Sequence, residues 1–208
     1  MFLSLSWRII RFNHDKPKNP FSDALMETLG SALIEADKED SVEAIVITGG
    51  ERRDFSAGGD FKEVSQMRTV NEVVSWIDRI IKLYTTILSV SKPVVGAISG
   101  YAIGVGFQVA MLCDLRVGSE KTEFIMWELQ KGIACTLGGF MLKKCVGRCH
   151  MLDMVYGCGS VKADQAIRIG LLNQIAAEED LIDESVNLAG KLADYPSVPF
   201  QYTKESAY

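Results

Sequence analysis

Residues 92–114, KPVVGAISGYAIGVGFQVAMLCD, hold the clearest structural signal in the chain. They open with an apolar run at 93–98 that is rich in β-branched residues, which predicts a buried strand. A glycine-rich turn follows at 100–106, and apolar residues resume from Phe107 to Leu112, so we expect strand, turn and helix. The first turn of a helix presents backbone N–H groups that lack intrahelical partners, at the positive end of the helix dipole. Those donors suit an anion, or an oxygen that becomes negative during a reaction.

A second stretch of the same kind lies upstream. Residues 42–48, VEAIVIT, predict another buried strand, and the small residues of SAGGD at 56–60 follow it. The two small-residue loops could converge on one oxygen. The alternative is that their glycines only permit tight turns and close packing. Neither loop has the spacing GxGxxG or GxxxxGK[ST], so the sequence gives no support to a dinucleotide site or a P-loop.

Composition is typical of a folded, soluble domain. The 208 residues suffice for one substantial core, and 48% are hydrophobic while 24% are charged. The net charge of −5 argues against general nucleic-acid binding, which needs a basic face. No apolar run reaches the roughly 18 residues of a membrane span. The N-terminal residues lack the pattern of a signal peptide, so we expect no membrane contact and a cytoplasmic location.

Cysteines and histidines do not suggest a metal site. The five cysteines lie in the second half of the chain and are odd in number, so we expect reduced thiols. Cys145, Cys149 and His150 are close in sequence, but no second cluster completes a set of four ligands. We therefore interpret them as packing residues and expect no metal. With only two histidines in the chain, a histidine-based triad or hydrolytic metal site is disfavoured.

Strands and helices alternate along the chain. We expect strands at 5–12, 42–48, 93–98, 115–118 and 173–176, and helices after Ser22 and at 61–67, 73–87, 107–112, 137–146, 150–157, 160–169 and 181–192. Ser22 and Ser160 are the predicted N-caps of their helices. The apolar residues Val73, Ile77, Ile80, Tyr84 and Ile87 recur every three or four positions, which predicts the buried face of a long helix. Repeated alternation of this kind predicts a layered α/β fold with parallel pairing.

Three motifs together resemble the crotonase (enoyl-CoA hydratase/isomerase) superfamily. They are FSAGGDF at 55–61, GYAIGVGFQ at 100–108 and MWELQKGI at 126–133, and the match extends to about residue 205. The resemblance implies a spiral of ββα units over residues 1–195 that binds an acyl-CoA thioester, with coenzyme A as part of the substrate and no other cofactor. Relatives continue into a helical layer that builds trimers. Residues 196–208 would be only its start, so we expect that layer to be largely missing and a homotrimer only where it is present.

The resemblance also implies roles for individual residues. The backbone N–H groups of Gly59 and Val105 would form an oxyanion hole for the thioester oxygen, where one preorganised donor is worth about 3 kcal/mol in such sites. Binding of the substrate and its coenzyme A would fall to Ala57, Gly58, Gly59, Asp60 and Phe61, together with Trp127. Trp127 stands where the family usually has proline, which would reshape the pocket beside Glu128.

The pattern departs from the family's hydratases at one catalytic position. Those enzymes typically carry two glutamates, whereas this chain has Gln108 at the first position and Glu128 at the second. An amide has no proton that titrates near neutral pH, so Gln108 cannot act as a general base for water. Simple hydration of an enoyl-CoA is therefore disfavoured, and chemistry that uses one carboxylate and an enolate remains open.

A narrower resemblance is to the carboxymethylproline synthases of carbapenem antibiotic biosynthesis. It includes NPFS at 19–22, WIDRIIKLY at 76–84 and WELQKGIAC at 127–135. It implies that malonyl-CoA is decarboxylated to an enolate, that the enolate adds to the cyclic imine pyrroline-5-carboxylate, and that the thioester is then hydrolysed. Glu128 would order the reacting groups and the hydrolytic water, and Gln108 would contact the carboxylate or imine of the substrate.

Other hypotheses for the function of the chain and for the roles of Gln108 and Glu128 remain open. The chain could be an enoyl-CoA isomerase, hydratase or acyl-CoA decarboxylase that uses Glu128 alone. It could also be a non-catalytic acyl-CoA-binding or assembly protein. Gln108 could merely satisfy neighbouring backbone groups, and Glu128 could be an exposed or salt-bridged turn residue.

Overall fold

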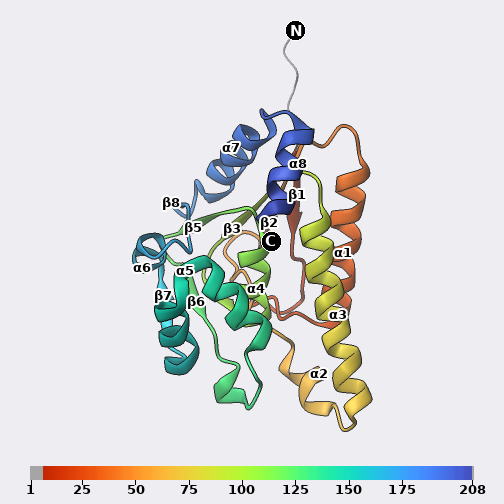
Figure 1. The fold of residues 1–208 in the computed structure, drawn as a ribbon, viewed down its shortest axis with the longest axis vertical. Helices are drawn as coiled ribbons and strands as arrows, with labels where there is room; N and C mark the ends of the chain where they lie inside the picture. The colour runs from red at the N-terminus through yellow and green to blue at the C-terminus, as the bar shows by residue number, and fades with distance from the viewer. Residues whose placement is uncertain (1–6, 208) are drawn as a thin grey trace.

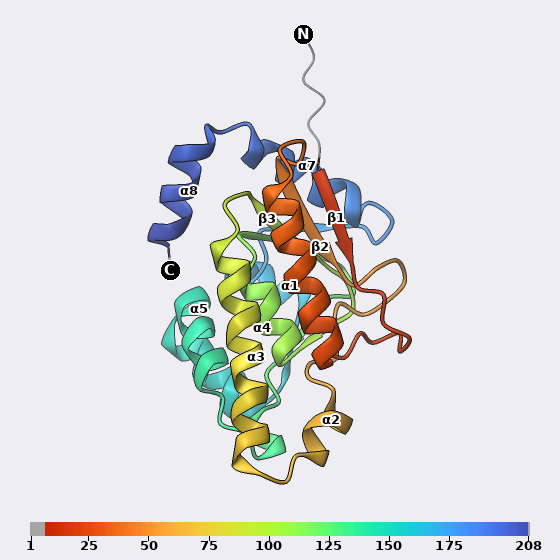
Figure 2. The same ribbon diagram turned by 90° about the vertical axis from the view of Figure 1, so that its right-hand side faces the viewer.

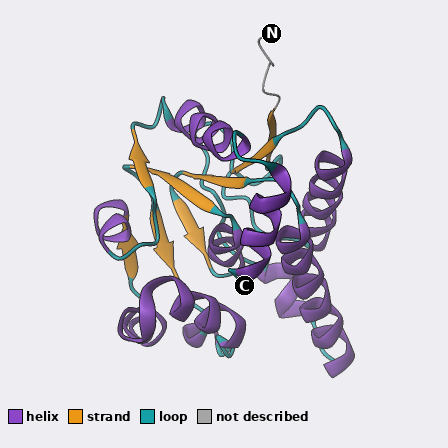
Figure 3. Cartoon of the chain, turned by 45° about the horizontal axis from the view of Figure 1, so that its top comes forward, coloured by secondary structure: helices purple, strands orange, loops and turns teal. Residues whose placement is uncertain are grey.

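The larger of two sheets forms the centre of the molecule. The computed structural model describes residues 7–207, and in them five parallel strands pair in the order β1-β2-β3-β5-β8 (Figures 1 and 3). Their bounds are β1 (Trp7–Arg11), β2 (Ala44–Thr48), β3 (Val94–Ile98), β5 (Leu115–Ser119) and β8 (Gln174–Ala176). The central strands β2 and β3 are buried along their whole length, as parallel strands covered on both faces require. The predicted α/β fold is confirmed, although residues 5 and 6 of the first expected strand lie outside the described residues.

Helices cover both faces of this sheet. On one face α1 (Asp23–Lys38) and α3 (Val70–Ser89) lie side by side, and α7 (Leu181–Ala193) covers the other (Figures 1 and 2). Because side chains alternate along a strand, Ile45 and Ile47 of β2 join the core on the α1 side, while Val46 packs in the core under α7. The prediction that Ser22 caps α1 is confirmed, since its hydroxyl accepts from the Leu25 N–H at 3.3 Å.

The smaller sheet was not predicted. It pairs β4 (Tyr101–Ile103) in parallel with β6 (Glu123–Ile125), and β6 in antiparallel with β7 (Ser160–Lys162). The expected turn at 100–106 therefore contains a strand. Ser160 begins a strand rather than capping a helix, and α6 (Ala163–Arg168) starts only after it. Three-residue strands are too short for alternation to reveal, and Val161 is fixed here by its cross-strand partner Phe124.

The long helix α3 departs in part from its predicted buried face. Ile80, Tyr84 and Ile87 are buried, but Val73 and Ile77 are 42% and 39% exposed. The reason is that the N-terminal part of α3 extends past the larger sheet toward α2 (Phe61–Gln66), as Figure 2 shows. The exposed apolar residues therefore lie at the same end of the molecule as α2.

The remaining helices complete the frame. Every residue of α4 (Val105–Leu112) is buried. The two helices expected at 137–146 and 150–157 are confirmed: α5 (Thr136–Gly157) consists of two helical segments that meet at a kink at Gly147, which has φ 76°. The last helix, α8 (Ser197–Ser206), is joined to the rest of the fold by a salt bridge: the buried Nζ of Lys204 lies 2.9 Å from Asp114 Oδ2. No helix among residues 7–207 has the length and apolar character needed to cross a bilayer.

Candidate active site

The two small-residue loops pack directly against each other. The Ser56 N–H donates to the Tyr101 carbonyl at 2.8 Å, and the Ile103 N–H donates to the Ser56 carbonyl at 2.9 Å. A Cβ on Gly106 would lie 2.4 Å from Ser56 Cβ, and one on Gly58 would lie 2.9 Å from the Ile103 carbonyl oxygen. Glycine is thus required for this approach. The close packing of the two loops is therefore confirmed, and their convergence on one oxygen stays a prediction.

Gly59 and Val105 become neighbours through this packing. A Cβ on Gly59 would lie 4.0 Å from Cγ2 of Val105. Phe21 pairs with the residues on either side of Gly59, through the Gly58 carbonyl and the Asp60 N–H, and leaves the Gly59 N–H without an acceptor among the described residues. Val105 is the first residue of α4, so its N–H has no intrahelical partner either. Two backbone N–H groups without an acceptor in the described part of the chain therefore lie on residues that are neighbours in space.

Both residues line a cavity of about 470 Å³ that is bounded by α2, α3, α4 and α5. Most of its lining is apolar, including Trp76, Ile77 and Ile80 of α3. Within the described chain, the side chains that bring polar groups to its wall are those of Trp76, Gln108, Trp127, Glu128, Lys131, Cys135 and Thr136. A mostly apolar cavity with a few polar groups is the usual form of a small-molecule site.

Three side chains form a hydrogen-bonded row that ends at the cavity wall: Gln108 and Glu128 line the cavity, and Tyr84 does not. The Tyr84 hydroxyl donates to Gln108 Oε1 at 2.8 Å, and Gln108 Nε2 donates to Glu128 Oε1 at 2.7 Å. The other carboxylate oxygen, Glu128 Oε2, is buried without a partner in the described residues. Neither sequence alternative for these residues holds, because Gln108 bonds to two side chains and Glu128 is neither fully exposed nor salt-bridged.

Burial sets the protonation of this row. It raises the pKa of the Glu128 carboxyl above its ordinary value, against opposing hydrogen bonds from the backbone and from Gln108. Burial and the nearby Glu128 charge raise the pKa of Tyr84 well above its ordinary value. The same two causes raise the pKa of Cys135 to about 12, so this thiol stays protonated and is a poor nucleophile. Glu128 is therefore the group in the row suited to proton transfer near neutral pH.

Lys131 supplies the positive charge at the cavity. It lies in the short 3-10 helix η1 (Leu129–Lys131), on the loop that carries Glu128. Its Nζ lies 5.7 Å from the ring centre of Phe61 and 5.7 Å from that of Trp127. It is the one cationic side chain among the described residues of the lining, so an anionic substrate group would be attracted to this side.

Nearly all residues predicted for the site meet at this cavity: Ala57, Gly58, Gly59, Phe61, Val105, Gln108, Trp127 and Glu128. Asp60 is the exception, since it does not line the cavity. Its carboxylate accepts from the Lys62 N–H at 3.0 Å, which caps α2, and pairs with Lys16 at 2.7 Å. The hydrogen bond from Lys16 lowers the pKa of Asp60, so its carboxylate is stabilised where it stands.

Sequence reasoning missed Trp76, Tyr84 and Lys131. Tyr84 fitted the apolar pattern of α3, and a spacing pattern does not show that its hydroxyl reaches a polar partner. Lys131 carried a usable signal, since it lies three residues after Glu128 in the same motif. The described residues hold no group of three or more His, Cys, Asp or Glu side chains placed to share a metal ion.

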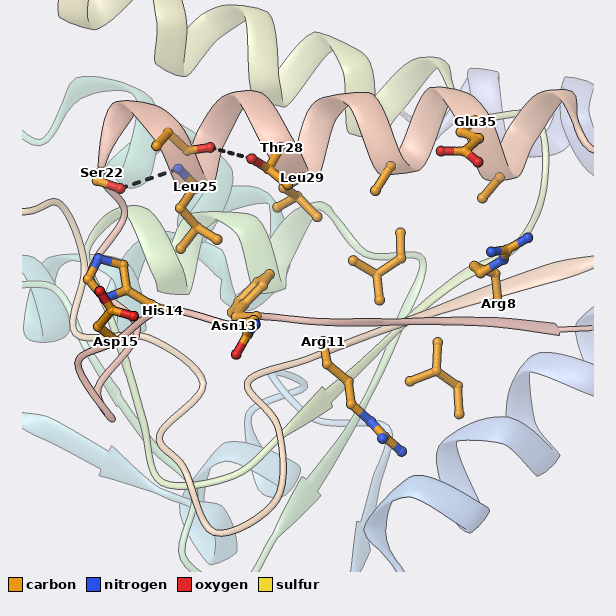
Figure 4. A pocket seen from close by; sticks show the side chains of 16 residues that line it. Arg8, Arg11, Asn13, His14, Asp15, Ser22, Leu25, Thr28, Leu29 and Glu35 are labelled. Atoms are coloured by element: carbon orange, nitrogen blue, oxygen red, sulfur yellow. Dashed lines mark hydrogen bonds between the residues drawn. The ribbon is translucent and has the colours of Figure 1, made fainter.

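A second hollow, of about 510 Å³, lies between β1 and α1 (Figure 4). Its wall includes Arg8, Arg11, His14 and Asp15. None of the residues predicted for catalysis borders it, so we place the chemistry in the cavity between α3, α4 and α5.

The chain matches known proteins in both sequence and structure. The family described as enoyl-CoA hydratase/isomerase matches residues 6–207. Carboxymethylproline synthase from Pectobacterium carotovorum subsp. carotovorum is 40% identical over 199 residues, 96% of this chain and 80% of the relative. The mitochondrial enoyl-CoA hydratase of Pongo abelii is 32% identical over 95% of this chain and 67% of its own length. The structure of ThnE from S. clavuligerus matches with a TM-score of 0.82 and 37% identity, covering 95% of this chain and 85% of that one.

Proposed function

This chain belongs to the enoyl-CoA hydratase/isomerase family, the crotonases, and we propose that it is a carbon–carbon bond-forming enzyme of the carboxymethylproline synthase type. The proposed substrates are malonyl-CoA and the cyclic imine pyrroline-5-carboxylate. The relative with that name, 40% identical over most of this chain, supports the choice within the family. Coenzyme A enters as part of the substrate, and the proposed reaction uses no other cofactor.

The observation that carries the proposal is the bond between Gln108 and Glu128. An amide stands where the family's hydratases place a first carboxylate, and its Nε2 donates to the remaining carboxylate at 2.7 Å. A hydratase needs groups that both remove and deliver protons, whereas Gln108 does neither. Decarboxylation of malonyl-CoA makes an enolate without removing a proton from carbon, so one carboxylate is enough.

The first proposed step uses the two free donors. The bond between the carboxylate carbon and the α-carbon of malonyl-CoA breaks, carbon dioxide leaves, and the electron pair moves onto the thioester oxygen as an enolate. The N–H groups of Gly59 and Val105 would hold that oxygen. Preorganised donors of this kind stabilise developing charge because they need no rearrangement during the reaction.

The next steps use the Glu128 side of the cavity. The α-carbon of the enolate attacks the carbon of the protonated imine, whose nitrogen takes up the electron pair and becomes a secondary amine. Water then attacks the thioester carbonyl, and the coenzyme A thiol leaves with a proton. Glu128, whose pKa is raised by burial, would accept the proton from that water. Its buried Oε2 has no hydrogen-bond partner among the described residues.

The positive charge of Lys131 would favour substrates that carry a carboxylate. Malonyl-CoA and pyrroline-5-carboxylate each carry a carboxylate, and the lining is otherwise mostly apolar. An ammonium group placed between Phe61 and Trp127 would pair with one of these carboxylates as substrates enter.

The experiment is turnover with both substrates. Purified protein with malonyl-CoA and pyrroline-5-carboxylate should yield carboxymethylproline by mass spectrometry, together with free coenzyme A. Acetyl-CoA in place of malonyl-CoA should give no product, and Glu128→Gln should lower product formation about 100-fold or more. Binding of malonyl-CoA by calorimetry without any product would contradict the proposal and favour an acyl-CoA-binding protein.

A second candidate is double-bond isomerisation of a 3-enoyl-CoA. It is favoured by the raised pKa of Glu128, which suits a single carboxylate that takes a proton from one carbon and returns it to another. Migration of the double bond in 3-enoyl-CoA, abolished by Glu128→Gln, with no product from malonyl-CoA, would select this reaction.

The wider setting is proposed on the resemblance alone. We propose a cytoplasmic enzyme of carbapenem antibiotic biosynthesis that assembles as a homotrimer. Light scattering of the purified chain tests the assembly, and a monomer at micromolar concentration would contradict it.

A further inference from the structure

We infer that Tyr84 is a positioning residue: its hydroxyl orients the Gln108 amide so that the N–H end, and not the carbonyl end, faces Glu128. The inference rests on the proposed function, because it explains how that site works with a single carboxylate. Tyr84 itself does not line the cavity, so it would act only through Gln108.

An amide side chain can be turned end for end with almost no change in shape. Turned one way, Gln108 donates to Glu128; turned the other way, its carbonyl oxygen would face a carboxylate oxygen and repel it. The Tyr84 hydroxyl donates to Gln108 Oε1 at 2.8 Å and so selects the first orientation. A phenol could accept from the turned amide, but that arrangement would leave two oxygen acceptors in contact beside Glu128.

Burial makes this selection strong. Tyr84 is 6% exposed and Gln108 is 7% exposed, so water cannot easily replace either hydrogen bond. A buried polar group without a partner costs about 1–3 kcal/mol. Gly138 of α5 leaves the space that the amide occupies, because a Cβ there would lie 2.9 Å from Gln108 Nε2. Helix α3 therefore bonds to the amide of α4 through Tyr84, and α5 packs close to it at Gly138.

The orientation matters for the charge on Glu128. The groups that interact with this carboxyl are Tyr84 from α3, Gln108 from α4 and Cys135 at the start of α5, while Lys131 on its own loop lines the same cavity. Tyr84 and Cys135 stay neutral, so the effect of burial is opposed by a backbone hydrogen bond at Glu128 and by the Gln108 N–H, which is the one side-chain donor to this carboxyl among the described residues. Without it, the carboxyl would bind a proton at higher pH and lose its capacity as a base.

The test compares Tyr84→Phe with the unchanged protein by NMR of ¹³C-labelled glutamate carboxyls, without substrate. The variant keeps the ring and removes only the hydroxyl, and Glu128→Gln assigns the resonance. We expect the Glu128 titration to move to higher pH, kcat for the proposed reaction to fall about tenfold, and KM to stay within about twofold. Tyr156→Phe, on an exposed tyrosine of α5, should change none of these three quantities.

A double variant separates positioning from general damage. In a Gln108→Leu background, Tyr84→Phe should produce no further shift of the Glu128 titration, because the residue through which it acts is gone. An equal shift in both backgrounds, or an unchanged titration in Tyr84→Phe, would overturn the inference. Because the NMR titration needs no turnover, a protein inactive toward malonyl-CoA would refute the proposed function and leave this test intact.

A measurement on the unchanged protein covers the case in which Tyr84→Phe does not fold. The side-chain NH₂ of Gln108 should show one proton that exchanges slowly with water and shifts with the Glu128 titration. Two fast-exchanging protons that do not follow the titration would overturn the inference.

Discussion

Gln108 Nε2 lies 2.7 Å from Glu128 Oε1, so an amide from α4 and a carboxylate from a loop 20 residues later in the chain share one hydrogen bond at the cavity wall. The pair provides one titratable carboxylate, that of Glu128, and one fixed hydrogen-bond donor, the amide of Gln108. It also leaves Glu128 Oε2 free of protein partners among the described residues. The chemistry of the site therefore depends on this hydrogen bond and on the two small-residue loops at 56–60 and 100–106.

Removing the Glu128 charge should stabilise the protein at neutral pH. Burial raises the pKa of Glu128 in the folded state, so the folded state binds more protons than the unfolded state between the two pKa values. Stability contributed by this group is thus present at low pH and lost as pH rises through the folded-state pKa. We expect Glu128→Gln to raise Tm at pH 7 by about 2–4 °C, the effect of about 1 kcal/mol in a chain of this size.

The control is the same comparison at acidic pH, below the ordinary pKa of glutamate, where Glu128 is protonated in both states. There the difference in Tm should shrink toward zero. A Glu128→Gln protein that is less stable than the unchanged protein at pH 7 would contradict the account of the carboxylate.

Restoring a second carboxylate should redirect the chemistry. Gln108→Glu would place two carboxylates in hydrogen-bond contact, which raises the pKa of one of them and supplies both an acid and a base. We expect crotonyl-CoA hydration, followed by loss of the enoyl absorbance, to rise at least about tenfold. Gln108→Met, of similar size and without a carboxylate, should show no gain. Rapid hydration by the unchanged protein would refute the assigned role of Gln108.

Neutralising Lys131 should weaken the preference for carboxylated substrates. Lys131→Met keeps the length of the side chain beside Phe61 and Trp127 but removes the charge. Because Lys131 is exposed, we expect KM for the carboxylated substrate it pairs with to rise only about fivefold, with kcat nearly unchanged. The matched control is Lys143→Met, an exposed lysine of α5 outside the cavity. Unaltered KM values for both substrates would show that Lys131 does not pair with a substrate carboxylate.

A methyl group on Gly106 should force the two loops apart. Its Cβ would lie 2.4 Å from Ser56 Cβ, and overpacking of this kind costs about 1–3 kcal/mol. Gly106→Ala should therefore lower the free energy of unfolding in urea by that amount and also reduce activity. Gly190→Ala in α7, where no atom lies within 4 Å of the new methyl group, should instead stabilise by about 0.5–1 kcal/mol. Equal effects of the two substitutions would contradict the close contact of the loops.

Sequence predicts the parts of this molecule that have strong local periodicity. The buried runs of β2 and β3 and the spacing of Ile80, Tyr84 and Ile87 in α3 identify a parallel α/β sandwich without tertiary information. The smaller sheet could not be predicted in this way. Its three-residue strands carry no measurable alternation, and Ser160 is held in β7 by pairing with Ile125 rather than by local preference.

In the candidate site, too, some features could be predicted from the sequence and others depend on tertiary contacts. The predicted roles of Gly59, Val105 and Glu128 come from the resemblance of their motifs to the crotonase family. The ion pair of Asp60 depends on Lys16, 44 residues away, whereas its cap of α2 is a local bond from the Lys62 N–H. The bond between Tyr84 and Gln108 likewise joins two helices, and no spacing rule within one helix reports a contact of that kind.

The central claim, that the N–H groups of Gly59 and Val105 hold one thioester oxygen, is tested most directly by isotope-edited infrared spectroscopy of a bound acyl-CoA. A nonreactive acyl-CoA labelled with ¹³C at the thioester carbonyl should show its carbonyl band at lower frequency when bound than when free, because two donors polarise the bond. The account predicts this shift in the unchanged protein and in Glu128→Gln. A bound ligand whose carbonyl band stays at its free position would contradict it.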